Sequence, residues 1–159
     1  MKNVALTCRA AWRLAALPLL LAACDPAATA PPVQVAEYHG ADDEAALTAF
    51  ARQQVPPPKQ AVLYFSADWC GPCRRFRAAL TDAQVATALQ PAALVRLDVD
   101  GYPALAASYG ITAIPAFLKV DAEGRVAAHI TSDKWQEDTP ANIAPVMQAL
   151  VSSPRYDAR

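Results

Sequence analysis

The chain has 159 residues and a formal net charge of −1, with 54% hydrophobic and 18% charged residues. This composition is typical of a folded globular protein and excludes a largely disordered chain. It also argues against a nucleic-acid-binding protein, because such proteins carry a strong excess of basic residues.

The first 23 residues have the organisation of a signal peptide. Lys2, Arg9 and Arg13 are the only charged residues before an apolar run over 14–23. That run is too short to cross the hydrocarbon core of a membrane, which needs about 20 apolar residues in a helix. We therefore expect residues 1–23 to be removed on export, which leaves the exported part more acidic than the whole chain.

The signal peptide runs into Leu-Ala-Ala-Cys at 21–24, which resembles the lipobox of bacterial lipoproteins. The resemblance implies that Cys24 receives a diacylglyceryl group and becomes the new N-terminus, so that its acyl chains anchor the protein to the membrane. The alternative is an ordinary signal peptide cut at an Ala-x-Ala site. In lipoproteins of Gram-negative bacteria, an aspartate at the position of Asp25 is associated with the inner membrane. We thus expect the periplasmic face of that membrane, with 24–32 as a Pro/Ala tether.

Periodicity and chain breakers predict one α/β domain over 33–153, followed by a flexible tail over 154–159. The run over 61–66 is continuously apolar, which is typical of a central strand covered on both faces. The alternation of elements predicts a central mixed sheet flanked by helices on both faces. We expect strands over 33–38, 61–66, 94–99, 116–120 and 125–131, and helices over 42–54, 70–80, 82–89, 103–109 and 139–151.

Two cysteines lie where the central strand ends and a helix begins. Cys70 and Cys73 are separated by Gly71 and Pro72. Across the first turn of a helix this spacing brings the Cα atoms to about 5 to 6 Å, close enough for a reversible disulfide. The helix N-terminus stabilises a thiolate on Cys70, which we expect to be exposed, with Cys73 covered. Pro72 suits a first turn, where its missing N–H has no helical partner, and Gly71 keeps the rim of the site open.

Two other interpretations of this pair are open. The first is that the pair is half of a zinc site. A closed structural zinc site needs four ligands, however, and only His39 and His129 remain, each isolated. Alternatively it is a permanent structural disulfide, for which the end of a strand at a strand-to-helix corner is a poor location. We expect neither a metal nor a cofactor.

The pentapeptide Trp-Cys-Gly-Pro-Cys over 69–73 is similar to the active-site sequence of the thioredoxin family, and the resemblance extends over roughly residues 60 to 150. It implies a thioredoxin-like fold, a thiol–disulfide oxidoreductase and a Trp69 that flanks the substrate groove. It also implies a cis peptide bond between Ile114 and Pro115, which would bind the substrate chain; a trans loop proline is the alternative. The segment around the cysteines looks most like the periplasmic electron-delivering domain of the DsbD type.

The sequence departs from the family at the position of a buried acid. Tyr64 stands where thioredoxins bury the aspartate that helps to move the proton of the second cysteine, and Arg96 stands where they usually have a lysine. The route of this proton must therefore differ from that of other thioredoxins, and Tyr64 and Asp68 are the candidate residues for it. Asp68 or a water is a candidate base, and a solvated loop acid is the alternative for Asp68.

The Gly-Pro dipeptide between the cysteines resembles the reducing members of the family. The substrates would be disulfides of cell-envelope proteins, with a transmembrane thiol donor as the electron source, because that compartment has no reducing buffer. The alternatives are an envelope thiol oxidase or isomerase, and a non-catalytic adaptor or metal chaperone on a thioredoxin scaffold. We expect a monomer that binds no nucleic acid. Trp135, in the charged stretch 133–138, is either a partner surface or folds back onto the domain.

Overall fold

The computed structural model describes residues 30–152. The predicted signal peptide, Cys24, most of the 24–32 tether and the tail over 154–159 lie outside the described residues, and those assignments stay predictions. Within 30–152, no helix combines the length and the hydrophobicity needed to span a membrane.

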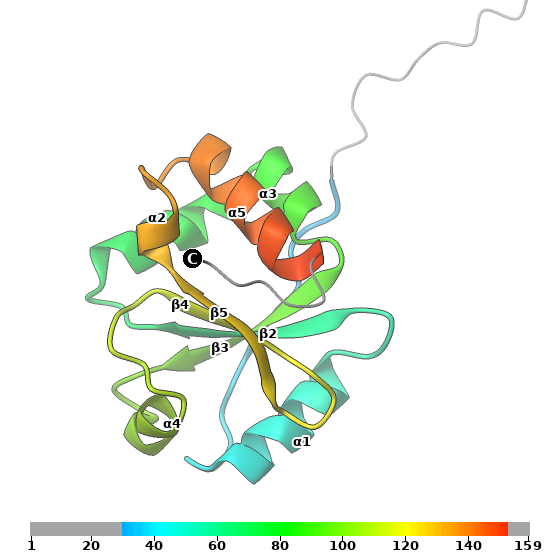
Figure 1. Ribbon diagram of the computed structural model, residues 1–159, viewed down its shortest axis with the longest axis vertical. Helices are drawn as coiled ribbons and strands as arrows, with labels where there is room; N and C mark the ends of the chain where they lie inside the picture. The colour runs from blue at the N-terminus through cyan, green and yellow to red at the C-terminus, as the bar shows by residue number, and fades with distance from the viewer. Residues whose placement is uncertain (1–29, 153–159) are drawn as a thin grey trace, which may run out of the picture.

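A single mixed sheet with strand order β1-β3-β2-β4-β5 forms the centre of the domain (Figure 1). Strands β1, β3 and β2 are parallel, whereas β4 is antiparallel to both β2 and β5. The predicted mixed sheet is therefore confirmed. Its strands are β1 (Val35–Glu37), β2 (Gln60–Ser66), β3 (Ala92–Asp98), β4 (Ala116–Val120) and β5 (Val126–Thr131).

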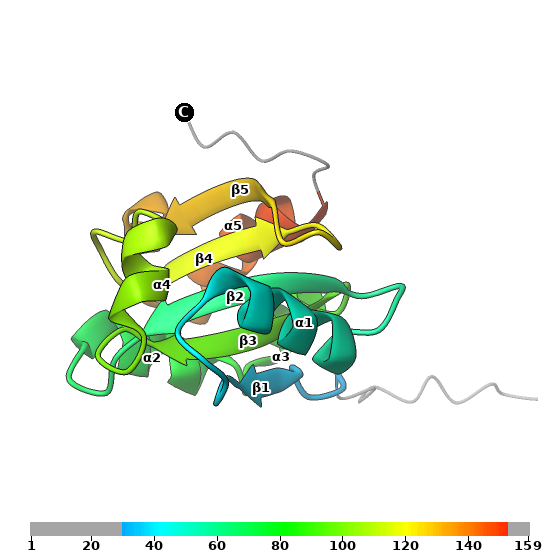
Figure 2. The same ribbon diagram turned by 90° about the horizontal axis from the view of Figure 1, so that it is seen from below.

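Helices cover both faces of this sheet, as predicted. One face carries α1 (Glu44–Gln54) and α4 (Pro103–Ser108), which lie in front of the sheet in Figure 2. The other face carries α2 (Gly71–Ala79), α3 (Ala83–Ala88) and α5 (Pro140–Ser152). Each predicted helix and strand is present with its ends shifted by a few residues. The short 3-10 helix η1 (Ser132–Lys134) was not predicted.

The central strand β2 is apolar over residues 61–65, and from Val62 onward it is buried on both faces. Val62 and Tyr64 belong to the core beneath α2, α3 and α5, whereas Leu63 and Phe65 belong to the core beneath α1 and α4. Successive side chains of a strand point to opposite faces, so one strand serves both cores. This strand therefore ends, at Ser66, in a rigid and well-packed position.

Two neighbouring aspartates stabilise the starts of two different helices. The Asp43 side chain accepts a hydrogen bond from the Ala46 N–H at 2.8 Å and caps α1. Its neighbour Asp42 accepts hydrogen bonds from the N–H groups of Ala104 and Leu105 at 2.8 and 2.9 Å. Asp42 thus ties the first turn of α4 to the segment that precedes α1.

Candidate active site

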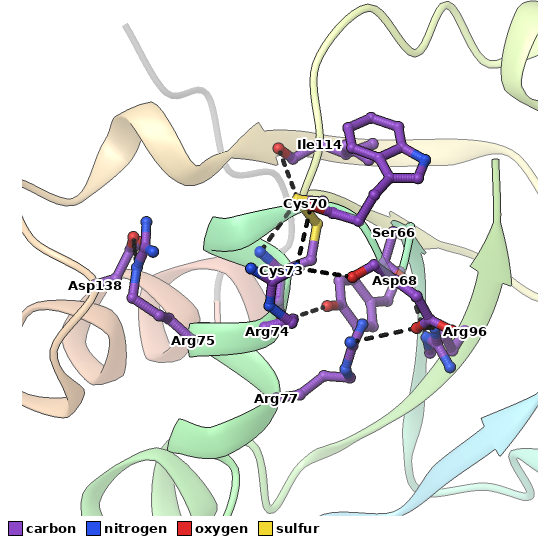
Figure 3. Close-up of a disulfide and its surroundings, with 12 residues drawn as sticks. Ser66, Asp68, Cys70, Cys73, Arg74, Arg75, Arg77, Arg96, Ile114 and Asp138 are labelled. Atoms are coloured by element: carbon purple, nitrogen blue, oxygen red, sulfur yellow. Dashed lines mark hydrogen bonds and ion pairs between the residues drawn. A yellow bond between two sulfur atoms is a disulfide. The ribbon is translucent and has the colours of Figure 1, made fainter. Parts of the chain in front are cut away.

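The cysteine pair lies at the carboxyl end of β2, where Cys70 is the N-cap of α2. Cys70 and Cys73 form a disulfide with a Cα–Cα distance of 5.3 Å (Figure 3), within the range that the spacing predicted. The Cys73 N–H donates to the Sγ of Cys70 at 3.2 Å. This contact puts the first sulfur against a backbone donor of the helix N-terminus, which is the environment that favours a thiolate.

Cys70 is more enclosed than predicted, whereas Cys73 is covered, as predicted. Cys70 keeps 4% of its surface exposed and Cys73 none, so Cys70 is the more accessible of the two but is not an exposed residue. Val99 and Ile114 pack against the small cluster that contains both cysteines, which explains the difference from the prediction. A substrate therefore reaches the pair at the Sγ of Cys70 only.

The peptide bond between Ile114 and Pro115 is cis, so the predicted isomer is confirmed. The carbonyl oxygen of Ile114 lies 3.7 Å from the Sγ of Cys70. Because that sulfur carries no proton in the disulfide, the distance describes a contact and not a hydrogen bond. A second cis bond, between Pro57 and Pro58, was not predicted.

Trp69 forms the exposed rim of the site. Its side chain is 66% exposed, and its indole Nε1–H donates to the Oδ2 of Asp100 at 2.8 Å. Asp100 was not predicted as a site residue. It follows β3, which is the parallel neighbour of β2, and the carboxyl ends of parallel neighbours meet at one edge of the sheet. That adjacency was the available signal for a partner of Trp69.

Tyr64 lies directly beneath the second cysteine. Its side chain is buried, and its hydroxyl donates to the carbonyl oxygen of Cys73 at 3.3 Å. Burial raises the pKa of Tyr64 above its ordinary value, although the nearby Arg77, Ser66 and Arg96 act in the opposite direction. Tyr64 is therefore a neutral hydrogen-bond donor at physiological pH and not a base.

Asp68 is bound by two arginines at the surface of the site. Its Oδ1 lies 2.9 Å from the Nη2 of Arg96 and 3.3 Å from the Nη2 of Arg77, and its side chain is 81% exposed. Arg96 also donates to the Ser66 hydroxyl at 2.9 Å and pairs with Glu37 at 3.2 Å. Desolvation tends to lower the pKa of Arg96, but Glu37 and Asp68 outweigh it and raise that pKa. Asp68 is thus a solvated member of an ion-pair cluster.

The thioredoxin family model matches residues 43–145, which is more than half of the chain. The chain belongs to the thioredoxin family. Thioredoxin H2 of Arabidopsis thaliana is 40% identical over 39% of this chain and 45% of its own length. The thioredoxin-like protein slr0233 of Synechocystis is 37% identical over 43% of this chain and 65% of its own length. The aligned part thus spans less than two thirds of these relatives.

Solved thioredoxins share the fold. A mutant thioredoxin from Halobacterium salinarum has a TM-score of 0.53 at 21% identity, over 77% of this chain and 95% of its own. The oxidised thioredoxin from Plasmodium falciparum has a TM-score of 0.51 at 15% identity, over 76% of this chain and 99% of its own. The predicted thioredoxin-like α/β fold is confirmed.

This thioredoxin domain carries an anchored segment beside its cysteine helix. Trp135 is buried against Phe76 and Phe117, so it folds back onto the domain instead of forming a partner surface. Its indole Nε1–H donates to the Oδ1 of Asp138 at 2.8 Å, and the Nε of Arg75 donates to the Oδ2 of Asp138 at 2.7 Å. Asp138 thus joins the segment after β5 to α2, a role that the sequence did not indicate.

The described part of the thioredoxin domain offers no cluster of three or more histidine, cysteine or acidic side chains that could hold a metal ion. Its chemical features are the disulfide, the helix N-terminus beneath Cys70, the exposed Trp69, and a half-buried Ile114 followed by a buried cis-Pro115. These are the elements that exchange between thiols and disulfides requires.

Proposed function

We propose that this protein is a thiol–disulfide oxidoreductase that reduces disulfides of proteins in the cell envelope. The observation that carries the proposal is the Cys70–Cys73 disulfide at the N-terminus of α2, with only Cys70 accessible and the Ile114–Pro115 loop against its sulfur. Membership of the thioredoxin family supports the same chemistry. A purely structural disulfide has no need of an accessible sulfur at a helix N-terminus beside a cis-proline loop.

The reaction begins with the reduced pair. The Cys70 thiolate attacks one sulfur of the substrate disulfide, the substrate S–S bond breaks, and the released substrate sulfur takes a proton from water. The resulting mixed disulfide joins Cys70 to the substrate. Cys73 then loses its proton and attacks the Sγ of Cys70, which releases the second substrate thiol. Two electrons have passed to the substrate, and Cys70 and Cys73 are again a disulfide.

The direction and the location of the reaction belong to the same proposal. The Gly71-Pro72 dipeptide favours a reductase, since it is similar to that of reducing members of the family. The signal peptide and Cys24 favour export and a lipid anchor at the periplasmic face of the inner membrane. A reductase in an oxidising compartment must be recharged, so we expect a transmembrane thiol donor as its partner.

The proposal is tested by reduction of a disulfide-bonded reporter protein, such as insulin, with dithiothreitol as the electron source. We expect turnover above the dithiothreitol background by the parent protein and none above it by Cys70→Ser. Reduced Cys73→Ser mixed with insulin after removal of dithiothreitol should accumulate a mixed disulfide, visible on a non-reducing gel. Cys8→Ser and Cys24→Ser are the matched controls and should retain turnover. A parent protein no faster than Cys70→Ser would overturn the proposal.

A further inference from the structure

Arg77 has a guanidinium N–H that the oxidised protein does not use. Its side chain is 28% exposed, and its Nη2 pairs with Asp68 at 3.3 Å. Its Nη1 is buried and makes no hydrogen bond of normal geometry among the described residues, although the guanidinium lies close enough to the Tyr64 hydroxyl to lower the pKa of that hydroxyl. A buried donor on a charged group costs free energy when it has no partner, so a state of the protein that supplies an acceptor is favoured.

The helix places this guanidinium near the second cysteine. Arg77 follows Cys73 by four residues on α2, and residues four apart lie on the same face of a helix. Side chains of a helix lean toward its N-terminus, so Arg77 extends back toward Cys73. Figure 3 shows the side chain leaving the helix one turn from Cys73 and ending beside Asp68.

The arginines on this side of α2 are more buried than the carboxylates that pair with them. Arg77 comes from α2 and Arg96 from β3, and each is mostly buried, whereas their partner Asp68 is 81% exposed and Glu37 of β1 is also exposed. Water screens the two carboxylates more strongly than the two guanidiniums. Tyr64 of β2 carries no charge here, and its hydroxyl hydrogen is already donated to the carbonyl oxygen of Cys73.

The other charged residues near α2 are engaged elsewhere. Arg74 is exposed and donates to the carbonyl oxygens of Asp68 and Trp69 at 2.9 and 3.1 Å. Arg75 pairs with Asp138 at 2.7 Å. Within 30–152, the only fully buried polar or charged residues are Ser66 and Lys119, so no buried carboxylate of this part of the chain is available to remove a proton from Cys73.

We propose that Arg77 is a positioning residue for the resolving step, whose buried guanidinium stabilises the thiolate of Cys73 when the disulfide is open. The inference rests on the proposed function and adds a residue that promotes its second step in the absence of a buried carboxylate base. In that step the Cys73 proton passes to water and the thiolate attacks the Sγ of Cys70. The Cys70–substrate bond breaks, and the substrate sulfur leaves with the electron pair and takes a proton from water.

The test follows the two thiols separately in the full-length protein carrying Cys8→Ser and Cys24→Ser. Reduced protein is mixed with excess dithiodipyridine, which releases one thiopyridone when Cys70 attacks. A second thiopyridone is released when Cys73 displaces it from Cys70, at a rate independent of reagent concentration. The rate of this second phase against pH has its midpoint at the pKa of the Cys73 thiol.

We expect Arg77→Met to raise the midpoint of the second phase by about one pH unit or more, and to slow that phase about tenfold at neutral pH. Arg77→Lys, which keeps the charge, should stay near the parent. Arg75→Met removes an exposed charge from the same helix and should leave the midpoint unchanged. A merely structural role of Arg77 would not move the midpoint.

An Arg77→Met variant with the parent midpoint would overturn the inference. If Arg77→Met is unfolded by circular dichroism, the same measurement on Arg77→Gln decides the matter, because glutamine keeps a donor and removes the charge. A parent protein with no concentration-independent second phase would instead contradict the proposed function itself. The two failures are therefore distinguishable.

Discussion

Tyr64 supports the active-site helix from beneath. Its ring stacks on Phe117 with the centroids 5.0 Å apart and meets Phe76 at 5.1 Å, while its hydroxyl donates to the Cys73 carbonyl. The ring contacts bury apolar area, and the hydroxyl adds one buried hydrogen bond. The residue therefore stabilises the domain in two separable ways.

These two contributions predict different losses for two substitutions. Tyr64→Phe keeps the ring and should lower the free energy of unfolding by about 1 kcal/mol, the usual net value of one hydrogen bond. Tyr64→Ala also removes the ring and should lower it by about 3 to 5 kcal/mol. Urea denaturation measures both. Equal losses for the two variants would show that the hydroxyl, and not the ring, dominates.

The sequence predicted those site residues that a local motif defines. Cys70, Cys73, Trp69 and Pro115 lie in short segments whose spacing carries the information. Three partners were missed for different physical reasons. The contacts of Asp100 with Trp69 and of Asp138 with Arg75 form through the tertiary fold, and the orphaned N–H of Arg77 depends on side-chain burial that no spacing reveals.

At the scale of elements, the Asp138 carboxylate ties the segment between β5 and α5 to helix α2. Desolvation tends to raise the pKa of Asp138, but hydrogen bonds from Trp135 and Arg75 outweigh it and hold that pKa below its ordinary value. A depressed folded pKa means that the ionised carboxylate stabilises the native state. This contribution is present above the unfolded pKa of about 3.9 and is lost as the pH falls through the folded value.

Asp138→Asn should consequently lower the free energy of unfolding at pH 7 by about 1 to 3 kcal/mol, the range for hydrogen bonds to a charged group. The difference from the parent should shrink as the pH falls below about 4, because the parent also loses the charge there. Denaturant titrations across this pH range measure both effects. Glu137→Gln changes an exposed neighbouring carboxylate and should alter stability by less than about 0.5 kcal/mol. A pH-independent difference would contradict the assignment.

The β4–β5 turn is fitted to α1 through a glycine. Gly124 has a φ of +81°, and a Cβ at this position would collide with the side chain of Thr48 on α1. Gly110 has a similar φ of +64°, but a Cβ at this position would meet no neighbouring atom. A side chain at 110 would therefore carry the backbone strain alone, without a collision. The turn therefore tolerates no side chain at 124 for two independent reasons.

Gly110→Ala should lower the free energy of unfolding by about 1 to 2 kcal/mol, the cost of a left-handed conformation for a residue with a Cβ. Gly124→Ala should cost clearly more, because the collision with Thr48 adds to that strain. Thermal unfolding of the two variants tests this order. Equal losses would show that the turn moves away from α1 without cost.

The elements themselves were predictable because each has a strong local signal. The apolar run of β2, the breakers after α1 and the glycine turn between β4 and β5 fix their positions within a few residues. The sequence left open how Trp135 packs, because a single tryptophan in a charged stretch has no periodicity. Its burial follows from the apolar surface that Phe76 and Phe117 present above the sheet.

At the scale of the whole molecule, the start of the described chain and the cysteine pair lie at opposite ends of the sheet. Strands β1, β2 and β3 are parallel, so all three start at the end where the described chain begins. Cys70 follows the far end of β2, whose seven residues rise about 3.3 Å each. A lipid anchor at Cys24, as proposed, would therefore be attached through the end of the domain opposite the redox pair.

The proposed lipid anchor predicts a change in location. Cys24→Ala should move the protein from the membrane fraction to the soluble fraction of the envelope, since in this proposal the acyl chains supply the binding. Cys8 belongs to the predicted signal peptide, which is removed on export. Cys8→Ala should therefore leave the protein in the membrane fraction. Immunoblots of the separated fractions measure both. A Cys24→Ala protein that stays with the membrane would contradict the lipoprotein assignment.

The reduction potential of the Cys70–Cys73 pair tests the central claim most directly. The protein is equilibrated with defined ratios of reduced and oxidised dithiothreitol or glutathione, and the peptide containing both cysteines is quantified by mass spectrometry after alkylation. We predict a value near that of thioredoxin, about −270 mV, which suits a reductase that a dedicated donor recharges. A value near −120 mV would make the protein an oxidant, and a pair that does not titrate would contradict the oxidoreductase account altogether.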